Sequence, residues 1–411
     1  MTEVTPKMRS VASAELAING GRPVRTKKMP ARRAIGRRER AMVRRVFRHY
    51  RKLDVDPGYQ GHFENVYCSK FAEYHGGGFA DAVSTGTAAL YVAIAALELS
   101  SGSEILVSPI TDPGTINAII ALGHVPRLVD SAPNSYNVDL EQFAIRVTPK
   151  TRAAIIVHAM GRAVDIQPIV EYSRDRGIRI IEDCSQAHGA RINGRLVGTF
   201  GDIAAFSTMY RKASITGASG GVVFTTQEET YHKVLLHADR GKPTWTPNFQ
   251  YNNPKLFRVP ALNFHTDEIS CAIGIASSHR LDQTIQRRLA FVKSLDGICD
   301  ASEICAPSGW SEGDSPFSYP IMVDTDRISV SKTEFALAIR AEGVDLNPHY
   351  EYLVCDWPYV TKYLDDHFTC PNARRMIETS FNLFVNERYG PNEAQDTIAA
   401  VSKVTGFFAS N

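Results

Sequence analysis

Short apolar runs alternate with helical patterns over the first two thirds of the chain. Seven runs have the length and the bounding turn residues of buried strands, near 80–84, 104–109, 126–130, 152–161, 178–184, 203–208 and 221–226. The intervening segments mostly predict helices, such as the apolar pattern that follows the small residues at 84–87. Strands that alternate with helices pair in parallel and carry helices on both faces of their sheet. The pattern therefore predicts an α/β fold with a mostly parallel, doubly wound sheet.

This alternation weakens after about residue 285. Later segments, among them YPIMVDTD (319–326) and NEAQDTIAAVSKV (392–404), predict a smaller α+β domain. A chain of 411 residues is also long for one compact core. We therefore predict an N-terminal segment over 1–60, a large domain over 61–285 and a small C-terminal domain over 286–411.

The N-terminal segment is strongly basic, although the net charge of the whole chain is only +2. Between Arg22 and Lys52 it holds fourteen lysines and arginines and a single acid, Glu39. Apolar residues recur there at helical spacing, namely Val43, Val46, Phe47 and Tyr50. Because no nucleic-acid-binding motif accompanies them, the stretch predicts an amphipathic helix with a solvated basic face and no nucleic-acid partner.

The cysteines and the apolar segments bear on the compartment. Seven cysteines are scattered without CxxC spacing, and their odd number fits a reducing environment. The N-terminus lacks the apolar region of a signal peptide, and no apolar run approaches the ~20 residues that span a bilayer. We expect a soluble cytoplasmic protein with no membrane association.

Residues able to bind a ligand follow several predicted strands, at the sheet edge where open α/β folds gather their ligands. Gly86 and Thr87 lie in the turn that opens a helix, where free N–H groups suit a phosphate, although Ser/Thr caps begin many helices without a ligand. Four polar residues lie at the end of the strand at 178–184 or just after it, namely Glu182, Asp183, Gln186 and His188. An acid there could bind a metal, act as a base or pair with a ring nitrogen. No further ligands occur at metal spacing, so we predict no metal site.

Lys212 follows the next strand, in the glycine-rich loop RKASITGASGG (211–221), and Ser207 precedes it by five residues. A lysine whose pKa is lowered can attack an aldehyde. Together with Asp183 and the turn at Gly86, these residues supply what a pyridoxal 5′-phosphate (PLP) site needs: an anion pocket, an acid for the ring nitrogen and a lysine for the aldehyde. A nicotinamide site would not need the lysine, and the GTAAL turn lacks the GxGxxG glycines.

The order and spacing of these blocks resemble the PLP-dependent sugar aminotransferases of fold type I, the DegT/StrS type. The resemblance extends from about INGGRPVR (18–25) to IAAVSKV (398–404). It includes VSTGTAALYVAIAAL, IIEDCSQAHGARINGRLVGTFGDIAAFST, the loop TGASGG after Lys212, LNFHTDEISCAIGIASSHRLD, and HY at 349–350. It implies a fold type I enzyme with a large PLP-binding domain and a small α+β domain.

The resemblance also implies roles for individual residues. Lys212 would bind the cofactor aldehyde covalently, Asp183 would pair with the pyridine nitrogen, and Gln186 would lie near the phenolic oxygen. Three residues would hold the phosphate, namely Gly86, Thr87 and Ser207. Asn263 matches an asparagine that reaches the phosphate bound by a neighbouring subunit, which implies a homodimer with shared active sites.

Three positions depart from the family pattern. The residue after Thr111 is usually an aromatic that stacks on the cofactor ring, and here it is Asp112. The arginine usual two residues after the interface asparagine is His265. The glutamate usual shortly before the paired glycines is absent from TGASGG, and the loop from Lys212 to Gly220 is one residue longer. These departures bear on the substrate more than on the cofactor chemistry.

The expected function is an aminotransferase that moves an amino group from glutamate or glutamine to a nucleotide-linked keto sugar. A cyclitol-ketone aminotransferase is an alternative with the same chemistry and an uncharged substrate. A PLP-dependent sugar dehydratase is a second alternative, which Lys212 disfavours because such dehydratases carry histidine there. A PLP-binding homologue without activity is a third alternative. The intact set of Asp183, Ser207 and Lys212 argues against it.

Overall fold

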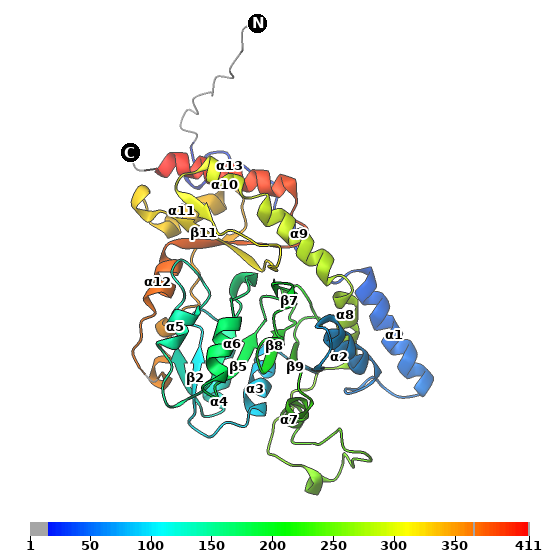
Figure 1. Ribbon diagram of the computed structural model, residues 1–411. Coiled ribbons are helices and arrows are strands. Elements are labelled where there is room, and N and C mark those ends of the chain that lie inside the picture. Colours follow the sequence, from blue (N-terminus) through cyan, green and yellow to red (C-terminus); the bar gives the residue numbers. More distant parts are fainter. Residues whose placement is uncertain (1–14, 365, 410–411) are drawn as a thin grey trace, which may run out of the picture.

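A seven-stranded sheet forms the centre of the large domain in the computed structural model, which describes residues 15–364 and 366–409 (Figure 1). In spatial order its strands are β1 (Phe79–Val83), β9 (Gly221–Thr225), β8 (Ile203–Ser207), β5 (Arg179–Asp183), β4 (Thr151–Val157), β2 (Glu104–Val107) and β3 (Val125–Leu128). All seven predicted strands are therefore present, and the prediction of a doubly wound α/β sheet is confirmed.

The sheet is parallel except for one strand. β9 runs antiparallel to both of its neighbours, β1 and β8, whereas the other pairs are parallel. The loop at 208–220 joins β8 to β9 without a crossover helix, and two neighbouring strands joined in this way pair antiparallel. The same loop carries Lys212, so the one departure from parallel order coincides with the candidate lysine.

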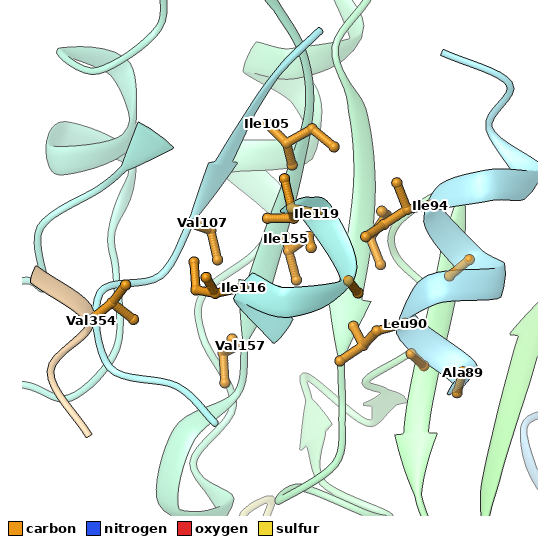
Figure 2. Close-up of a cluster of buried hydrophobic side chains, with 14 of the residues drawn as sticks. Ala89, Leu90, Ile94, Ile105, Val107, Ile116, Ile119, Ile155, Val157 and Val354 are labelled. Atoms are coloured by element: carbon orange, nitrogen blue, oxygen red, sulfur yellow. The ribbon is translucent and has the colours of Figure 1, made fainter. Parts of the chain in front are cut away.

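Alternate residues of the buried strands pack into two different hydrophobic cores, one on each face of the sheet. Along β4, Ala153, Ile155 and Val157 pack on one face of the sheet, whereas Ala154 and Ile156 pack on the other. The first face is covered by helices α3 (Gly86–Ala96), α4 (Pro113–Ala121) and α7 (Glu228–Ala238), as Figure 2 shows for part of this cluster. The second is covered by α2 (His62–Tyr74), α5 (Leu140–Ala144), α6 (Gln167–Arg174) and α8 (Glu268–Ser278).

The C-terminal part forms a smaller, antiparallel sheet. Its strands, in spatial order, are β10 (Cys305–Pro307), β11 (Ser318–Val323), β13 (Ser380–Phe384) and β12 (Leu346–Asn347). Four helices accompany it, namely α10 (Gly297–Ala301), α11 (Lys332–Ala341), α12 (Pro371–Glu378) and α13 (Pro391–Phe408). Helix α9 (Leu281–Lys293) connects the two parts and contains the predicted boundary at 285/286 (Figure 1). The antiparallel sheet fits the predicted α+β character, and the domain limits themselves stay predictions.

The N-terminal segment does not pack as one unit. Leu16 is buried in the core of the small domain, and Arg25 forms ion pairs with Glu393 and Asp396 of α13. The predicted segment begins at residue 1, and its residues 1–14 lie outside the part of the chain that the structure describes.

The basic helix is α1 (Arg37–Leu53), which packs against α8 (Figure 1). Val46 and Tyr50 are buried, but Phe47 is 52% exposed and Val43 is only half-buried. The prediction of one apolar face with four members is therefore wrong for Phe47, because a single neighbouring helix covers only a narrow stripe of α1. Within the described residues, no helix combines the length and apolar character needed to cross a membrane.

Candidate active site

A cavity of about 980 Å³ lies at the carboxyl ends of β5 and β8. Six of the seven predicted site residues line it, namely Gly86, Thr87, Asp183, Gln186, Ser207 and Lys212. Further walls come from residues 30–35, which we call the strap, and from the C-terminal part, including Phe317 just before β11 and Phe384 of β13. The volume suits a ligand of cofactor size together with a small substrate.

Asp183 is the last residue of β5, and its side chain faces the α3–α4 side of the sheet. The alternation of the strand sets this direction, since Ile181 packs on that face and Ile180 on the other. The Thr115 hydroxyl donates to Asp183 Oδ2 at 3.1 Å, and the Ser185 N–H donates to Oδ1 at 3.1 Å. The carboxylate is only 3% exposed and has no cationic partner among the described residues, so it retains capacity for a buried N–H donor.

Glu182 points to the opposite face, and its hydrogen bonds are used within the protein. Its two oxygens accept the N–H groups of Gly198, Phe200 and Gly201, each at 2.7 Å, and His158 Nε2 donates to Oε2 at 3.2 Å. Burial would raise the pKa of Glu182, but the bonds from His158 and the backbone outweigh it and lower that pKa.

His158, Glu182 and Cys184 lie close enough together to resemble a metal cluster. However, His158 Nδ1 already accepts the Val164 N–H at 3.0 Å, and its Nε2–H is used by Glu182. Burial also raises the pKa of Cys184 well above its usual value, so its thiol is protonated. This group therefore serves to fix the loop after β5 rather than to bind an ion.

The start of α3 and the end of β8 form a narrow cradle. Thr85 caps α3 by accepting the Ala88 N–H at 2.8 Å, while the N–H groups of Gly86 and Thr87 remain without an acceptor among the described residues. A side chain at Gly86 would place its Cβ 2.5 Å from Ser207 Cβ, so glycine is required there. Free N–H groups beside the Ser207 hydroxyl form a site that suits a phosphate.

His188 fixes the end of β8 by a hydrogen bond from outside the cavity. Its Nε2 donates to the Ser207 carbonyl oxygen at 2.7 Å, and the Ser207 N–H donates to Ser185 Oγ at 3.1 Å. Burial lowers the pKa of His188 to about 3, so the ring is neutral at physiological pH. His188 therefore positions Ser207 and does not line the cavity itself.

Lys212 reaches the cavity from the loop between β8 and β9. No described carboxylate forms an ion pair with it, and its amine lies 4.5 Å from the centre of the Phe317 ring. Burial lowers the pKa of Lys212 to about 8, and the charges of Asp183 and Asp112 only partly oppose this. About a tenth of this amine is therefore uncharged, and nucleophilic, at pH 7, far more than for a lysine of ordinary pKa.

Gln186 is held by residues from two other segments. Its Oε1 accepts the Met160 N–H at 2.7 Å, and its side chain is hydrogen-bonded to the Tyr350 hydroxyl. Met160 has a positive φ of 61°, which a methionine adopts only under constraint. The sequence predicted Gln186, but it gave no sign of the contact with Met160.

Asp112 occupies the position where the family resemblance leads us to expect an aromatic residue. It is exposed and caps α4 by accepting the Gly114 N–H at 2.9 Å. A stacked pair of rings, Tyr350 and Tyr352, lines the cavity nearby, with ring centres 4.8 Å apart. The Thr111 N–H donates to the Tyr352 carbonyl oxygen at 3.3 Å, so this pair lies directly beside the Asp112 loop.

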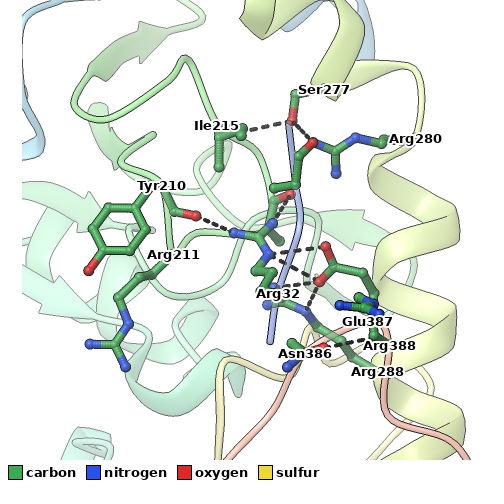
Figure 3. A network of polar contacts seen from close by, with 12 residues as sticks. Arg32, Tyr210, Arg211, Ile215, Ser277, Arg280, Arg288, Asn386, Glu387 and Arg388 are labelled. Carbon is green, nitrogen blue, oxygen red and sulfur yellow. Dashed lines mark hydrogen bonds and ion pairs between the residues drawn. The ribbon is translucent and has the colours of Figure 1, made fainter. Parts of the chain in front are cut away.

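The strap is fixed by a network around Arg32 (Figure 3). Arg32 donates to the Tyr210 carbonyl oxygen at 2.5 Å and pairs with Glu387 at 3.0 Å. Glu387 also pairs with the buried Arg288 at 3.1 Å, and Arg288 donates to the Pro316 carbonyl oxygen. This network joins the N-terminal segment, the Lys212 loop and the small domain around one cavity.

Asn263 alone among the predicted site residues lies outside the cavity. It is exposed, and its Oδ1 accepts the His265 N–H at 3.1 Å in a local turn. His265 in turn lies 3.1 Å from the buried Asp239. Within this chain Asn263 therefore contacts none of the other predicted site residues.

Comparison with known proteins gives a family match over most of the chain. The DegT/DnrJ/EryC1/StrS aminotransferase family matches residues 40–402. GDP-perosamine synthase of Escherichia coli O157:H7 is 34% identical over 229 residues, which cover 56% of this chain and 61% of that protein. L-glutamine:2-deoxy-scyllo-inosose aminotransferase of Micromonospora echinospora is 29% identical and covers 68% of each chain. The matched segment is thus shorter than two thirds of the first of these relatives.

Solved structures share the fold. An aminotransferase from Psychrobacter cryohalolentis superposes with a TM-score of 0.84 at 24% identity, covering 92% of this chain and 99% of that one. The E. coli GDP-4-keto-6-deoxy-D-mannose-3-dehydratase with bound hydrated PLP superposes with a TM-score of 0.82 at 23% identity, covering 91% and 99%. The predicted fold type I architecture is confirmed.

Proposed function

Because the chain belongs to the DegT/DnrJ/EryC1/StrS aminotransferase family, we propose that it is a PLP-dependent aminotransferase that transfers an amino group from glutamate or glutamine to a keto sugar. The observation that carries this proposal is the meeting of Lys212, Asp183 and the Gly86–Ser207 cradle in one cavity. An anion cradle, a buried unpaired carboxylate and a lysine of lowered pKa are the three features that this cofactor requires.

Each residue then has a defined task. When bound, pyridoxal 5′-phosphate supplies an electron-withdrawing ring for the carbon that carries the amino group. The helix start at Gly86 and Thr87, with Ser207, holds the phosphate. Asp183 keeps a proton on the ring nitrogen through its negative charge. Lys212 binds the aldehyde carbon and afterwards, as a free amine, moves a proton as a general base and acid.

A nucleotide-linked sugar is the substrate class that the cavity's charges favour. Arg33 and Arg211 line the cavity, are exposed, and form no ion pair with any described residue. Arg211 lies over the Phe384 ring, 5.4 Å from its centre. Two free guanidinium groups suit the charge of a diphosphate, whereas an uncharged cyclitol would leave them unused.

A cyclitol ketone is the second candidate substrate. The observation that favours it is the similarity to the Micromonospora echinospora aminotransferase, whose name states a scyllo-inosose substrate. The two candidates differ in their need for the free arginines. Changing Arg33 and Arg211 together to alanine should raise KM about 10- to 100-fold for a nucleotide-linked ketosugar. The same change should leave KM for 2-deoxy-scyllo-inosose within about twofold.

We also propose a homodimer with shared sites, in which Asn263 serves the neighbouring cavity. Its exposure and its distance from the cavity of its own chain support this arrangement. Mixing the inactive Lys212→Ala chain with an impaired Asn263→Ala chain should restore part of the activity, because one site of each hybrid dimer inherits neither change. If subunits demonstrably exchange and no activity returns, each site is completed within a single chain.

The central test is chemical labelling of Lys212. The protein incubated with PLP should become yellow, and borohydride reduction should leave the cofactor attached to the peptide that contains Lys212. Lys212→Ala should lose this label and all measurable transamination, while Lys233→Ala, which changes a surface lysine, should keep both. A label on another lysine, or a protein that takes up no PLP, would refute the proposed function.

A further inference from the structure

Cys355 and Cys370 form a pair of thiols outside the proposed active site. Cys355 lies in the short helix η5 (Val354–Asp356), and Cys370 caps the start of α12. The Cys355 thiol donates to the carbonyl oxygen of Thr369, the residue before Cys370, at 3.4 Å, and the two side chains interact although both remain free thiols. Cys370 is fully buried, whereas Cys355 is half-buried. Of the two thiols, Cys355 is therefore the one that a small reagent can reach.

A nearby cation favours negative charge on the Cys355 sulfur. Arg374 Nη2, one turn into α12, donates to Cys355 Sγ at 3.6 Å and is itself held by Asp356 Oδ1 at 2.5 Å. The hydrogen bond from the Cys370 thiol, aided by Arg374, lowers the pKa of Cys355 in spite of burial and of Asp356. The same bond raises the pKa of Cys370. This is the arrangement of an attacking thiolate with a protonated partner.

Other cysteines lack this arrangement. Burial raises the pKa of Cys68, Cys184 and Cys271 well above its usual value, so these thiols are protonated and unreactive. The contrast sets Cys355 apart from all three.

We propose that Cys355 and Cys370 are a reversible redox pair that a peroxide converts into a disulfide. The Cys355 thiolate attacks one peroxide oxygen, the O–O bond breaks, hydroxide leaves, and Cys355 becomes a sulfenic acid. The Cys370 sulfur then attacks the Cys355 sulfur, and its proton leaves with the displaced hydroxide as water. In sum, two thiols lose two electrons and two protons, and one hydrogen peroxide becomes two waters.

The pair is connected to the wall of the cavity. The Val354 N–H donates to the Pro109 carbonyl oxygen at 2.9 Å, and the neighbouring Tyr352 carbonyl accepts from Thr111. Tyr352 itself lines the cavity. A disulfide at Cys355 therefore ties the segment that carries Tyr352 to the start of α12.

Peroxide treatment of the full-length protein tests this proposal. The reduced protein is exposed to equimolar hydrogen peroxide, its remaining thiols are blocked with N-ethylmaleimide, and its peptides are analysed by mass spectrometry. We expect a Cys355–Cys370 cross-linked peptide that has lost two hydrogens and that dithiothreitol separates. In Cys370→Ser, oxidation should stop at a sulfenic acid on Cys355 that dimedone traps. Cys68→Ser, the matched control, should cross-link like the wild type.

The role of Arg374 is tested by the rate at which iodoacetamide alkylates Cys355 at neutral pH. Arg374→Ala should slow this rate about 5- to 10-fold, and Arg374→Lys should retain most of it. Arg375→Ala changes the exposed neighbouring arginine and should have no effect. The proposal fails if the folded wild type forms no cross-link, or if Cys68 reacts as fast as Cys355.

Discussion

Two walls of the same cavity are built in different ways. The sheet wall, made of Gly86, Asp183, Ser207 and Lys212, presents polar groups that lack full partners within the chain. The strap wall is centred on Arg32, which forms an ion pair with Glu387. Its guanidinium N–H groups also donate to two carbonyl oxygens of the loop that carries Lys212. Lys212 and Arg32 are buried cations on these two walls, and of these two only Arg32 is neutralised by a neighbouring acid, Glu387.

This difference separates the groups that bind a ligand from the groups that stabilise the fold around it. A buried group without a partner costs stability, and such groups persist where a ligand completes them. A fully paired network adds rigidity and leaves little capacity for a ligand. We therefore expect changes on the sheet wall to affect chemistry more than stability, and changes in the paired Arg32 network of the strap to affect stability and geometry first.

Among the changes that compare the two walls, the largest effect should come from Asp183→Asn. The amide oxygen can still accept the Ser185 N–H and the amide NH2 can donate to the Thr115 hydroxyl oxygen, but a neutral amide cannot hold a ring proton by charge, so turnover should fall about 10²- to 10³-fold. Unfolding free energy should change by less than about 1 kcal/mol. Steady-state kinetics and urea denaturation of the same preparation measure both quantities.

The adjacent acid provides the matched control. Glu182→Gln removes a charge that accepts four hydrogen bonds on the other face of the sheet, so it should cost about 2–4 kcal/mol of stability. The turnover of the fraction that remains folded should stay within about threefold. If Asp183→Asn loses stability and keeps its turnover, the two acids have been assigned the wrong way round.

The sequence was sufficient to predict most of the sheet wall. Asp183 and Ser207 end strands that their apolar runs reveal, Lys212 follows the second of these strands, and parallel strands bring their ends to one edge. Thr115 could not be predicted as the partner of Asp183, because nothing local to α4 marks a contact with β5. The antiparallel course of β9 was missed for a related reason, since its apolar run does not encode direction.

The contacts of the strap wall could not be predicted from the sequence. Arg32 was predicted only as one charge in a basic stretch, yet it contacts the Tyr210 and Ala213 carbonyls and Glu387 of the small domain. Such contacts depend on how distant segments meet, which periodicity does not report. Phe47 was misassigned for the same reason, because the apolar pattern does not say how wide a stripe the neighbouring helix covers.

An intermediate effect is expected for Arg32→Ala. The change removes the donor to Tyr210 and one of the two cations on Glu387, which should cost about 1–3 kcal/mol of stability. It should also raise KM for the amino acceptor, because the Lys212 loop loses its support. Arg44→Ala, an exposed arginine on α1, should leave thermal unfolding unchanged. Equal losses in both variants would mean that the strap network contributes no more than general surface charge.

The smallest effect concerns the unpaired cation of the sheet wall, measured in the protein freed of PLP. Burial lowers the pKa of Lys212 to about 8 from 10.5, so the folded state is penalised wherever the amine is charged. The penalty is complete below pH 8. Between about pH 8 and 10.5 the unfolded chain binds the proton that the folded chain has lost, so stability should rise with pH.

Lys212→Met isolates this contribution, because Lys332 also has a pKa lowered to about 8 by burial and would contribute to the same slope. The variant should be more stable than the wild type by about 1–2 kcal/mol at pH 7, a value reduced for the partial exposure of Lys212. The advantage should shrink steadily above pH 8. Chemical denaturation at half-unit intervals of pH measures it, and parallel curves for the two proteins would show that the Lys212 charge is already compensated within the folded chain.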